Sequence, residues 1–292
     1  MRRNRRDFIK KTTAMAGAAI VLPGMAMGKP LFPGSKPSLD KFGIQLYTLR
    51  DVIPDDPKGT IKQLASYGYK QIEGFEGEQG MFWNMPHKDF RMFLDDLGLT
   101  MISSHCNIRE NFEEKAAQAA EIGMSYLICP YIGPQKSVDA WKEVTDLFNS
   151  CGEICKKNGI RFAYHNHEYS FKSFSGMIPQ EFMMKNTDPD LVDHQMDIYW
   201  VVTGGADPVD FLTRYSGRFK LCHVKDRKKN AGDERDASCD LGTGFIDYPK
   251  ILKVAADHGM RFYIVEQERY DNSTPMESAK ADAKYLKKLK FM

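Results

Sequence analysis

The sequence lacks the features that would place it among membrane proteins or disulfide-rich proteins. No run of about 18 consecutive apolar residues is present, so we expect no membrane-spanning helix. No two of the six cysteines have C-x-x-C spacing, and Cys151 and Cys155, on one expected helix, are typical of packing rather than of a disulfide. The composition, 42% hydrophobic and 27% charged over 292 residues, is that of a globular chain long enough for one large domain.

A strong basic charge is also absent once the first 28 residues are set aside. Those residues carry six Arg or Lys and one Asp, a net of +5, so the formal net charge of +2 becomes −3 for the remainder. This balance argues against a large nucleic-acid footprint, and we expect no nucleic-acid partner.

Residues 1–28 have the order of charges and apolar residues that is typical of an export signal. Arg5-Arg6-Asp7-Phe8-Ile9-Lys10-Lys11 precedes a mildly apolar stretch from Ala14 to Met27, and this pattern resembles a twin-arginine signal. A basic tail that leads into an amphipathic helix is the alternative. We expect export to the periplasm, with cleavage near Ala26 to Gly28.

Strand-like and helix-like segments alternate through a single expected domain, residues 41–292, which follows a linker over residues 29–40. Eight such βα units in about 250 residues predict a (β/α)8 TIM barrel. An open doubly wound sheet is the alternative, but residues 47–51, after the first strand, lack the glycine-rich fingerprint of that fold. The expected strands are 42–47, 71–75, 99–105, 126–129, 160–167, 192–197, 219–224 and 262–266. The expected helices are 60–67, 88–97, 112–122, 138–157, 180–185, 208–215, 248–258 and 277–289.

Four of these strands end in residue types that commonly bind metals. In chain order these residues are His165 and His167, Asp197, His223 and Glu266. In a parallel barrel the carboxyl ends of the strands meet at one mouth, where active sites lie. Each residue taken alone has an ordinary alternative, namely a packed core histidine, a helix-capping aspartate or an ion-paired glutamate. Together they predict a metal site.

Longer motifs around these residues resemble the xylose isomerase-like barrel superfamily, over about residues 42–289. The superfamily includes sugar isomerases, ketose 3-epimerases, inosose dehydratases, enzymes that act on 3-keto-glycosides, and zinc AP endonucleases. The motifs are Tyr164-His165-Asn166-His167-Glu168, Met196-Asp197-Ile198-Tyr199-Trp200, His223-Val224-Lys225-Asp226, Leu241-Gly242-Thr243-Gly244-Phe245-Ile246-Asp247 and Ile264-Val265-Glu266.

The resemblance implies one divalent metal ion. In the ketose epimerases a Glu, an Asp, a His and a Glu on the last four strands hold the ion, and the last three carry over onto Asp197, His223 and Glu266. The first position is His165 here, which puts the symmetric mechanism with two proton-shuttling carboxylates in doubt. His167 and Glu168 are the alternative ligands from the fifth strand. This donor set suits Mn, Zn, Co or Fe better than Mg.

The implied activity is that of an isomerase, an epimerase or a lyase on a keto sugar or a 3-keto-glycoside. A divalent metal stabilises an enediolate while a neighbouring base removes the proton next to the carbonyl. The candidate catalytic residues are Glu266, His165 and His167. The candidate substrate contacts are Glu73, His105, Glu168 and Lys225.

Two other functions are compatible with the sequence. One is an AP-endonuclease-like zinc phosphodiesterase, against which the net charge and the export signal both speak. The other is a non-catalytic sugar-binding barrel, which the replacement at His165 leaves open. The expected partner is a small-molecule sugar, and a homodimer is implied by the resemblance only.

Overall fold

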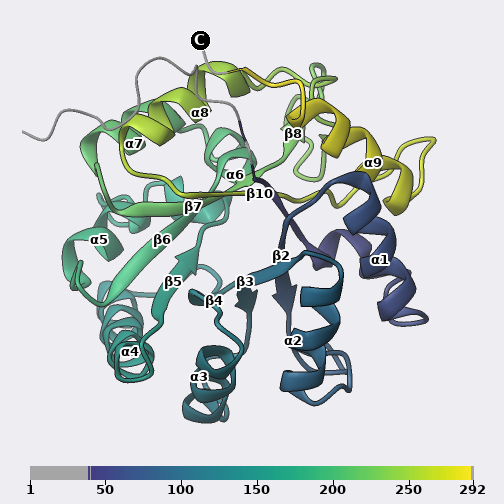
Figure 1. Ribbon diagram of the computed structural model, residues 1–292. Helices are drawn as coiled ribbons and strands as arrows, with labels where there is room; N and C mark the ends of the chain where they lie inside the picture. The colour runs from purple at the N-terminus through teal and green to yellow at the C-terminus, as the bar shows by residue number, and fades with distance from the viewer. Residues whose placement is uncertain (1–38, 40, 291–292) are drawn as a thin grey trace, which may run out of the picture. The chain divides into compact units, whose positions relative to one another are not determined.

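The computed structural model describes residue 39 and residues 41–290, in which eight parallel strands close into a barrel (Figure 1). The strands pair in the order β1-β10-β7-β6-β5-β4-β3-β2, so β1 closes the ring against β10. The expected TIM barrel is therefore confirmed. The strands are β1 (Gly43–Gln45), β2 (Gln71–Phe75), β3 (Thr100–His105), β4 (Tyr126–Cys129), β5 (Arg161–His165), β6 (Val192–Asp197), β7 (Phe219–Val224) and β10 (Phe262–Val265).

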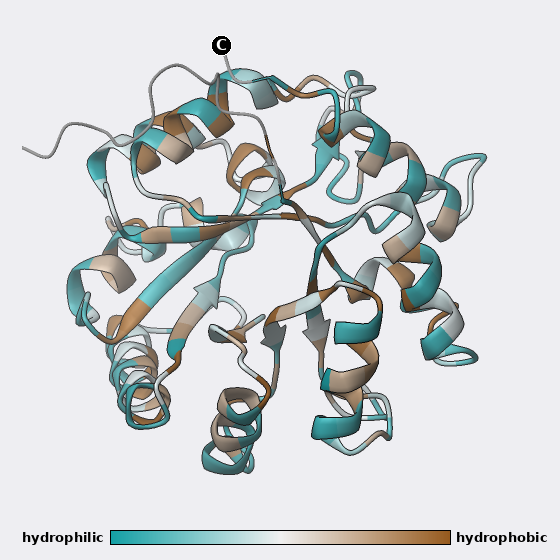
Figure 2. Ribbon diagram, viewed as in Figure 1, coloured by the Kyte–Doolittle hydropathy of each residue, from teal (hydrophilic) through white to brown (hydrophobic). Residues whose placement is uncertain are grey.

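Helices follow the strands along the chain and lie outside the ring (Figure 1). Along these helices, hydrophilic residues alternate with apolar ones (Figure 2). The α-helices are α1 (Pro57–Tyr67), α2 (His87–Asp96), α3 (Phe112–Glu121), α4 (Val138–Lys157), α5 (Pro179–Asn186), α6 (Ile198–Thr203), α7 (Pro208–Arg214), α8 (Tyr248–Asp257) and α9 (Pro275–Leu286). The structure also has two 3-10 helices. One, η1 (Leu46–Leu49), directly follows β1, and the other, η2 (Glu168–Phe171), begins three residues after the end of β5.

Local sequence signals set several helix boundaries. Asp56, Ser137 and Thr274 accept hydrogen bonds from backbone N–H groups in the first turns of α1, α4 and α9. Gly68 ends α1 in the left-handed conformation, with φ of 100°, which residues with a Cβ atom rarely adopt. These caps fix where each helix begins and ends, and so where the strands enter the barrel.

The barrel interior is layered, and the layers place the polar site above an apolar plug. Ile102, Tyr126, Ile128, Ala163, Leu221 and Ile264 form a small buried cluster separate from the main core. Because alternate residues of a strand face the same side, Ala163 precedes His165, Leu221 precedes His223 and Ile264 precedes Glu266 on the inner face. The main core packs the other face of the strands against the helices.

Some features differ from the sequence expectations. β5 ends at His165 rather than at His167, and η1, η2, α6 and the hairpin β8 (Asp226–Arg227) with β9 (Ser238–Cys239) were not expected. The predicted signal over residues 1–28 lies outside the described residues, as does the predicted linker over 29–40 apart from residue 39. Within the described part of the chain, no helix combines the length and the apolar character needed to cross a bilayer.

The motif Leu241–Asp247 is a loop that one carboxylate holds in place. Asp226 accepts hydrogen bonds from the backbone N–H groups of Gly242 (3.0 Å), Gly244 (3.0 Å) and Ile246 (3.2 Å). A Cβ atom on Gly244 would lie 2.1 Å from Oδ1 of Asp226 and 2.3 Å from the carbonyl oxygen of Arg227. Glycine is therefore required at position 244 by close approach.

We expect Gly244→Ala to lower the free energy of unfolding on the order of 1–3 kcal/mol, because the added methyl group displaces Asp226 from the loop. Denaturant-induced unfolding followed by circular dichroism measures the change. Thr243→Ser, at an exposed position of the same loop, keeps the hydroxyl that donates to Asp240, and this matched control should change stability by less than about 0.5 kcal/mol. Equal stability of Gly244→Ala and the wild type would contradict the argument.

Candidate active site and metal centre

Four side chains converge at the carboxyl ends of the strands. His165 ends β5, Asp197 ends β6, His223 lies one residue before the end of β7, and Glu266 directly follows β10. One ligand-type atom from each lies within 4.8 Å of the others, and all four residues are buried. The structure therefore brings the predicted ligand set together. Its binding of a metal stays a prediction.

Glu73, on β2, lies beneath this cluster. Its side chain has no exposed surface, and its carboxylate accepts hydrogen bonds from Gln45 (2.9 Å), Ser103 (2.6 Å) and Gln195 (2.7 Å). It also contacts Nε2 of His223 at 2.5 Å. Both oxygens of Glu73 thus have partners within the protein, and the expected contact of Glu73 with substrate stays a prediction.

The contact between Glu73 and His223 joins two opposite charges. Burial lowers the pKa of His223, but Glu266 and Glu73 outweigh burial and hold this pKa well above its usual value. Burial likewise raises the pKa of Glu73, but His105 and His223 bring it below its usual value. Nε2 of His223 contacts Glu73. The other ring nitrogen, Nδ1, lies 3.2 Å from Oε2 of Glu266 and 3.7 Å from Oδ2 of Asp197.

Gln195, two residues before Asp197 on β6, orients two further imidazoles. Its Oε1 lies 3.1 Å from Nδ1 of His165 and 2.8 Å from Nε2 of His105. An amide oxygen only accepts hydrogen bonds, so both of these nitrogens carry protons. With the proton on Nδ1, the neutral ring of His165 keeps a free lone pair on Nε2, which lies 4.0 Å from Oδ2 of Asp197.

Asp197 divides its two oxygens between the fold and the cluster. Oδ1 accepts a hydrogen bond from the backbone N–H of Trp200 (3.0 Å) and so caps α6. Oδ2 is buried and has no hydrogen-bond partner among the described residues. A buried carboxylate oxygen without a hydrogen bond is costly, and the imidazoles of His223 (Nδ1 at 3.7 Å) and His165 (Nε2 at 4.0 Å) are the charged or polar groups beside it.

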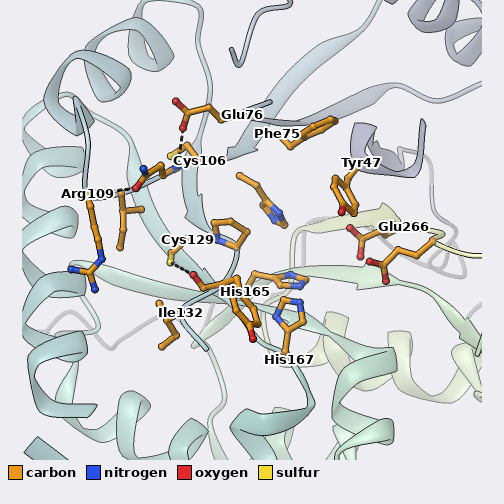
Figure 3. A pocket seen from close by; sticks show the side chains of 16 residues that line it. Tyr47, Phe75, Glu76, Cys106, Arg109, Cys129, Ile132, His165, His167 and Glu266 are labelled. Carbon is orange, nitrogen blue, oxygen red and sulfur yellow. Dashed lines mark hydrogen bonds between the residues drawn. The ribbon is translucent and has the colours of Figure 1, made fainter. Parts of the chain in front are cut away.

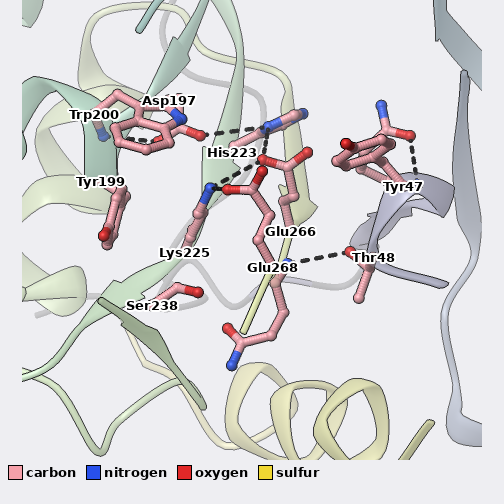
Figure 4. Close-up of polar contacts among 12 residues, drawn as sticks. Tyr47, Thr48, Asp197, Tyr199, Trp200, His223, Lys225, Ser238, Glu266 and Glu268 are labelled. Atoms are coloured by element: carbon pink, nitrogen blue, oxygen red, sulfur yellow. Dashed lines mark hydrogen bonds and ion pairs between the residues drawn. The ribbon is translucent and has the colours of Figure 1, made fainter. Parts of the chain in front are cut away.

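Glu266 and Glu268 share one buried lysine (Figure 4). The ammonium group of Lys225 is in contact with Oε2 of Glu268 and lies 3.5 Å from Oε2 of Glu266. It also lies over the rings of Tyr199 (4.9 Å) and Trp200 (4.7 Å). Burial raises the pKa of Glu266, but His223 and Lys225 outweigh burial, so its pKa is well below the usual value and the group is ionised.

A pocket of about 630 Å³ opens onto the cluster (Figure 3). Of the sequence-predicted site residues, His105, His165, His167 and Glu266 line it. Lys225 is fully buried behind Glu268, and Glu168 is bound to Arg235 through a 2.8 Å ion pair. Neither Lys225 nor Glu168 lines the pocket, and their expected contact with substrate stays a prediction.

His167 lies just beyond the end of β5, between the cluster and the open pocket. Its ring stands edge-on to His165 (4.9 Å between centroids) and to Tyr131 (5.1 Å). Burial, followed by the charge of Lys225, lowers the pKa of His167 to about 3. The ring is therefore a neutral imidazole at neutral pH, and its Nδ1 has no hydrogen-bond partner among the described residues.

Sequence analysis missed several residues that line the pocket or shape the cluster. Gln195 sits in an ordinary strand, and only its same-face spacing from Asp197 could have indicated it. The pocket residues Tyr47, Glu76, Arg109 and Tyr131 belong to loops and a 3-10 helix without a metal-type pattern. Glu268 was visible as the second carboxylate of Glu266-Gln267-Glu268, but nothing in the sequence pointed it into the pocket.

Known proteins share this architecture. The chain is 29% identical over 164 residues to an inosose dehydratase from Clostridium perfringens, a match that covers 51% of this chain and 54% of that protein. The chain thus spans about half the length of the first curated relatives that it matches. A crystal structure of a sugar phosphate isomerase/epimerase from Parabacteroides distasonis matches with 32% identity and a TM-score of 0.74, over 87% of this chain and 96% of that one.

A more distant structural neighbour supports the fold alone. The crystal structure of the IOLI protein with a bound zinc atom has a TM-score of 0.68 and 15% identity, and the match covers 84% of this chain and 95% of that one. Residues 61–289 match the family described as xylose isomerase-like TIM barrel. The chain therefore belongs to the xylose isomerase-like TIM barrel family.

Proposed function

We propose that this protein is a metal-dependent enzyme that modifies keto sugars, as an isomerase, an epimerase or a lyase. The observation that carries the proposal is the convergence of His165, Asp197, His223 and Glu266, in which Oδ2 of Asp197 accepts no hydrogen bond. The relatives support the substrate class, since they are named as an inosose dehydratase and a sugar phosphate isomerase/epimerase.

The four converging residues fit a divalent cation. Two carboxylates and two imidazoles, each with an atom free to face the others, form a donor set that suits Mn, Zn, Co or Fe. Glu73 and Gln195 hold the far nitrogens of His223 and His165, as the outer partners of metal-binding histidines do. When bound, such a cation would polarise the carbonyl group of a hydroxy ketone.

The side chains of the pocket supply the proton transfer. The C–H bond next to the ketone breaks, its electron pair moves toward the carbonyl oxygen, and a base accepts the proton. His167 is neutral and faces the pocket, and Glu266 is ionised and faces it from β10. Return of the proton to the other face gives epimerisation, return to the neighbouring carbon gives isomerisation, and loss of a leaving group gives elimination.

The charge of the pocket favours an uncharged sugar over a phosphorylated one. Arg109 is the single Arg or Lys among the sixteen lining residues, whereas Glu76, Glu266 and Glu268 are carboxylates. Export to the periplasm, proposed from residues 1–28, would also favour an unphosphorylated substrate such as a 3-keto-glycoside. No feature of the described residues favours the phosphodiesterase alternative, which needs cationic contacts to a backbone of phosphates.

The first test is metal content together with hydrogen exchange. We expect about one divalent ion per chain by mass spectrometry, and incorporation of deuterium next to the ketone of a 3-keto-glucoside in heavy water. His167→Asn should keep the metal and slow exchange by about 10²- to 10⁴-fold, because it removes a proton acceptor. His258→Asn, at the end of α8 and outside the pocket, is the matched control. A metal-free protein after supply of Mn, Co and Zn, with no exchange, would leave a sugar-binding barrel instead.

We expect Glu73→Gln to weaken divalent metal binding by about 10- to 100-fold, because His223 loses the carboxylate that orients it. Competition with a chromogenic chelator measures the affinity. Ser103→Ala removes a different hydrogen bond of Glu73 and leaves His223 in contact, so its effect should be several-fold smaller. The prediction fails if both variants fold and bind metal with equal affinity.

A further inference from the structure

The pocket is larger than the cluster it opens onto and extends away from it. His165, His167 and Glu266 lie on one side, and Glu76, Arg109 and Ile132 lie on the other (Figure 3). The first side belongs to β5 and β10, whereas the second belongs to the segments that follow β2, β3 and β4. A sugar whose reacting carbonyl lies at the cluster therefore leaves the second side available to another part of the same substrate.

Two exposed aromatic rings line the walls of this pocket: Tyr131 follows β4, and Tyr47, on η1 after β1, lies beside Glu266 (Figure 3). Five large hydrophobic side chains are exposed among the described residues, and two of them, Tyr47 (39%) and Tyr131 (56%), line the pocket. An exposed apolar surface that continues into a concave site is typical of a ligand contact. Met92, Val138 and Phe245, the other three, do not line the pocket.

Both tyrosine rings are held by neighbours, so they present fixed surfaces. Tyr131 packs edge-on against His167 (5.1 Å) and Tyr169 (5.5 Å). Tyr47 packs edge-on against Phe75 (5.3 Å), and the guanidinium group of Arg50 lies 4.8 Å from its centroid. A ring fixed in this way contributes contact area at little cost in conformational entropy.

The polar wall beside these rings is also fixed. Glu76 accepts hydrogen bonds from the backbone N–H of Asn107 (2.7 Å) and from the ammonium group of Lys115 (2.7 Å). The charge of Lys115 is thereby paired with that of Glu76. Arg109 is the single Arg or Lys that lines the pocket. The wall offers hydrogen-bonding groups without the cluster of cations that a phosphate would need.

We propose that Tyr47 and Tyr131 form a subsite for a second, uncharged ring that is joined by a glycosidic bond to the sugar at the cluster. The ring is a second pyranose or an aromatic aglycone, since both present a flat apolar face to an aromatic side chain and both lack charge. The inference rests on the proposed function for the identity of the first sugar, and its own support is the aromatic rim. Chemistry at the cluster and recognition of the second ring then fall to different loops.

Binding without turnover tests the subsite. The probes are methyl β-glucoside with one ring, cellobiose with a second sugar ring, and phenyl β-glucoside with an aromatic ring, each measured by calorimetry or ligand-observed NMR. We expect the wild type to bind at least one two-ring probe about 3- to 10-fold more tightly than methyl β-glucoside. Tyr131→Ala and Tyr47→Ala should remove this preference, and Tyr131→Phe should retain it. Met92→Ala, exposed on α2, is the control.

Each result has one reading. A preference for cellobiose alone or for phenyl β-glucoside alone identifies the second ring and supports the subsite. Equal binding of all three probes to the wild type, or equal weakening of all three in the tyrosine variants, would overturn it. A dimer in sedimentation that the tyrosine variants abolish would also overturn it and assign the rim to contacts between copies.

The subsite and the proposed chemistry fail separately. A two-ring preference in a protein that shows neither metal nor hydrogen exchange would keep the subsite and remove the enzymatic proposal. Hydrogen exchange in a protein that binds one-ring and two-ring probes equally would keep the enzymatic proposal and remove the subsite. A KM that rises for a 3-keto-disaccharide but not for 3-keto-glucose in Tyr47→Ala would support both, since the ring of Tyr47 is held by Phe75 and Arg50 rather than by the four residues of the cluster.

Discussion

The buried contact between Glu73 and His223 is the interaction on which the rest of the site depends. Two charges at the centre of a barrel are costly unless each is fully hydrogen-bonded. Glu73 meets this condition with donors from β1, β3, β6 and β7, so one carboxylate ties four strands to its own. The orientation of His223, the position of Gln195 and the space beside Asp197 all follow from that arrangement.

Much of this could be read from the sequence, because periodicity carries it. Eight strand-like runs separated by helical segments predicted the barrel, and four strands match their expected bounds. The same-face rule placed His165, Asp197, His223 and Glu266 at one mouth, since each lies within one residue of the carboxyl end of its strand. Local pattern suffices where a residue's role depends on its own strand.

The remaining roles depend on contacts across the barrel, which no local pattern encodes. Glu73 looked like a mouth residue, but its partners are 28 to 150 positions away in the chain. Lys225 looked accessible after His223, yet Glu268, 43 positions later, covers it. His167 was expected within the fifth strand, and the chain instead turns into η2 after His165, so its ring faces the pocket beside Tyr131.

At the proposed metal centre, the charged state of His223 would link metal loading to acidity. The cluster holds a proton on an imidazole whose pKa is well above the usual value, and a cation that takes the same nitrogen must displace that proton. Below the pKa, each unit fall in pH would then weaken the apparent affinity about tenfold. Occupancy of the proposed centre would therefore depend on acidity as well as on metal supply.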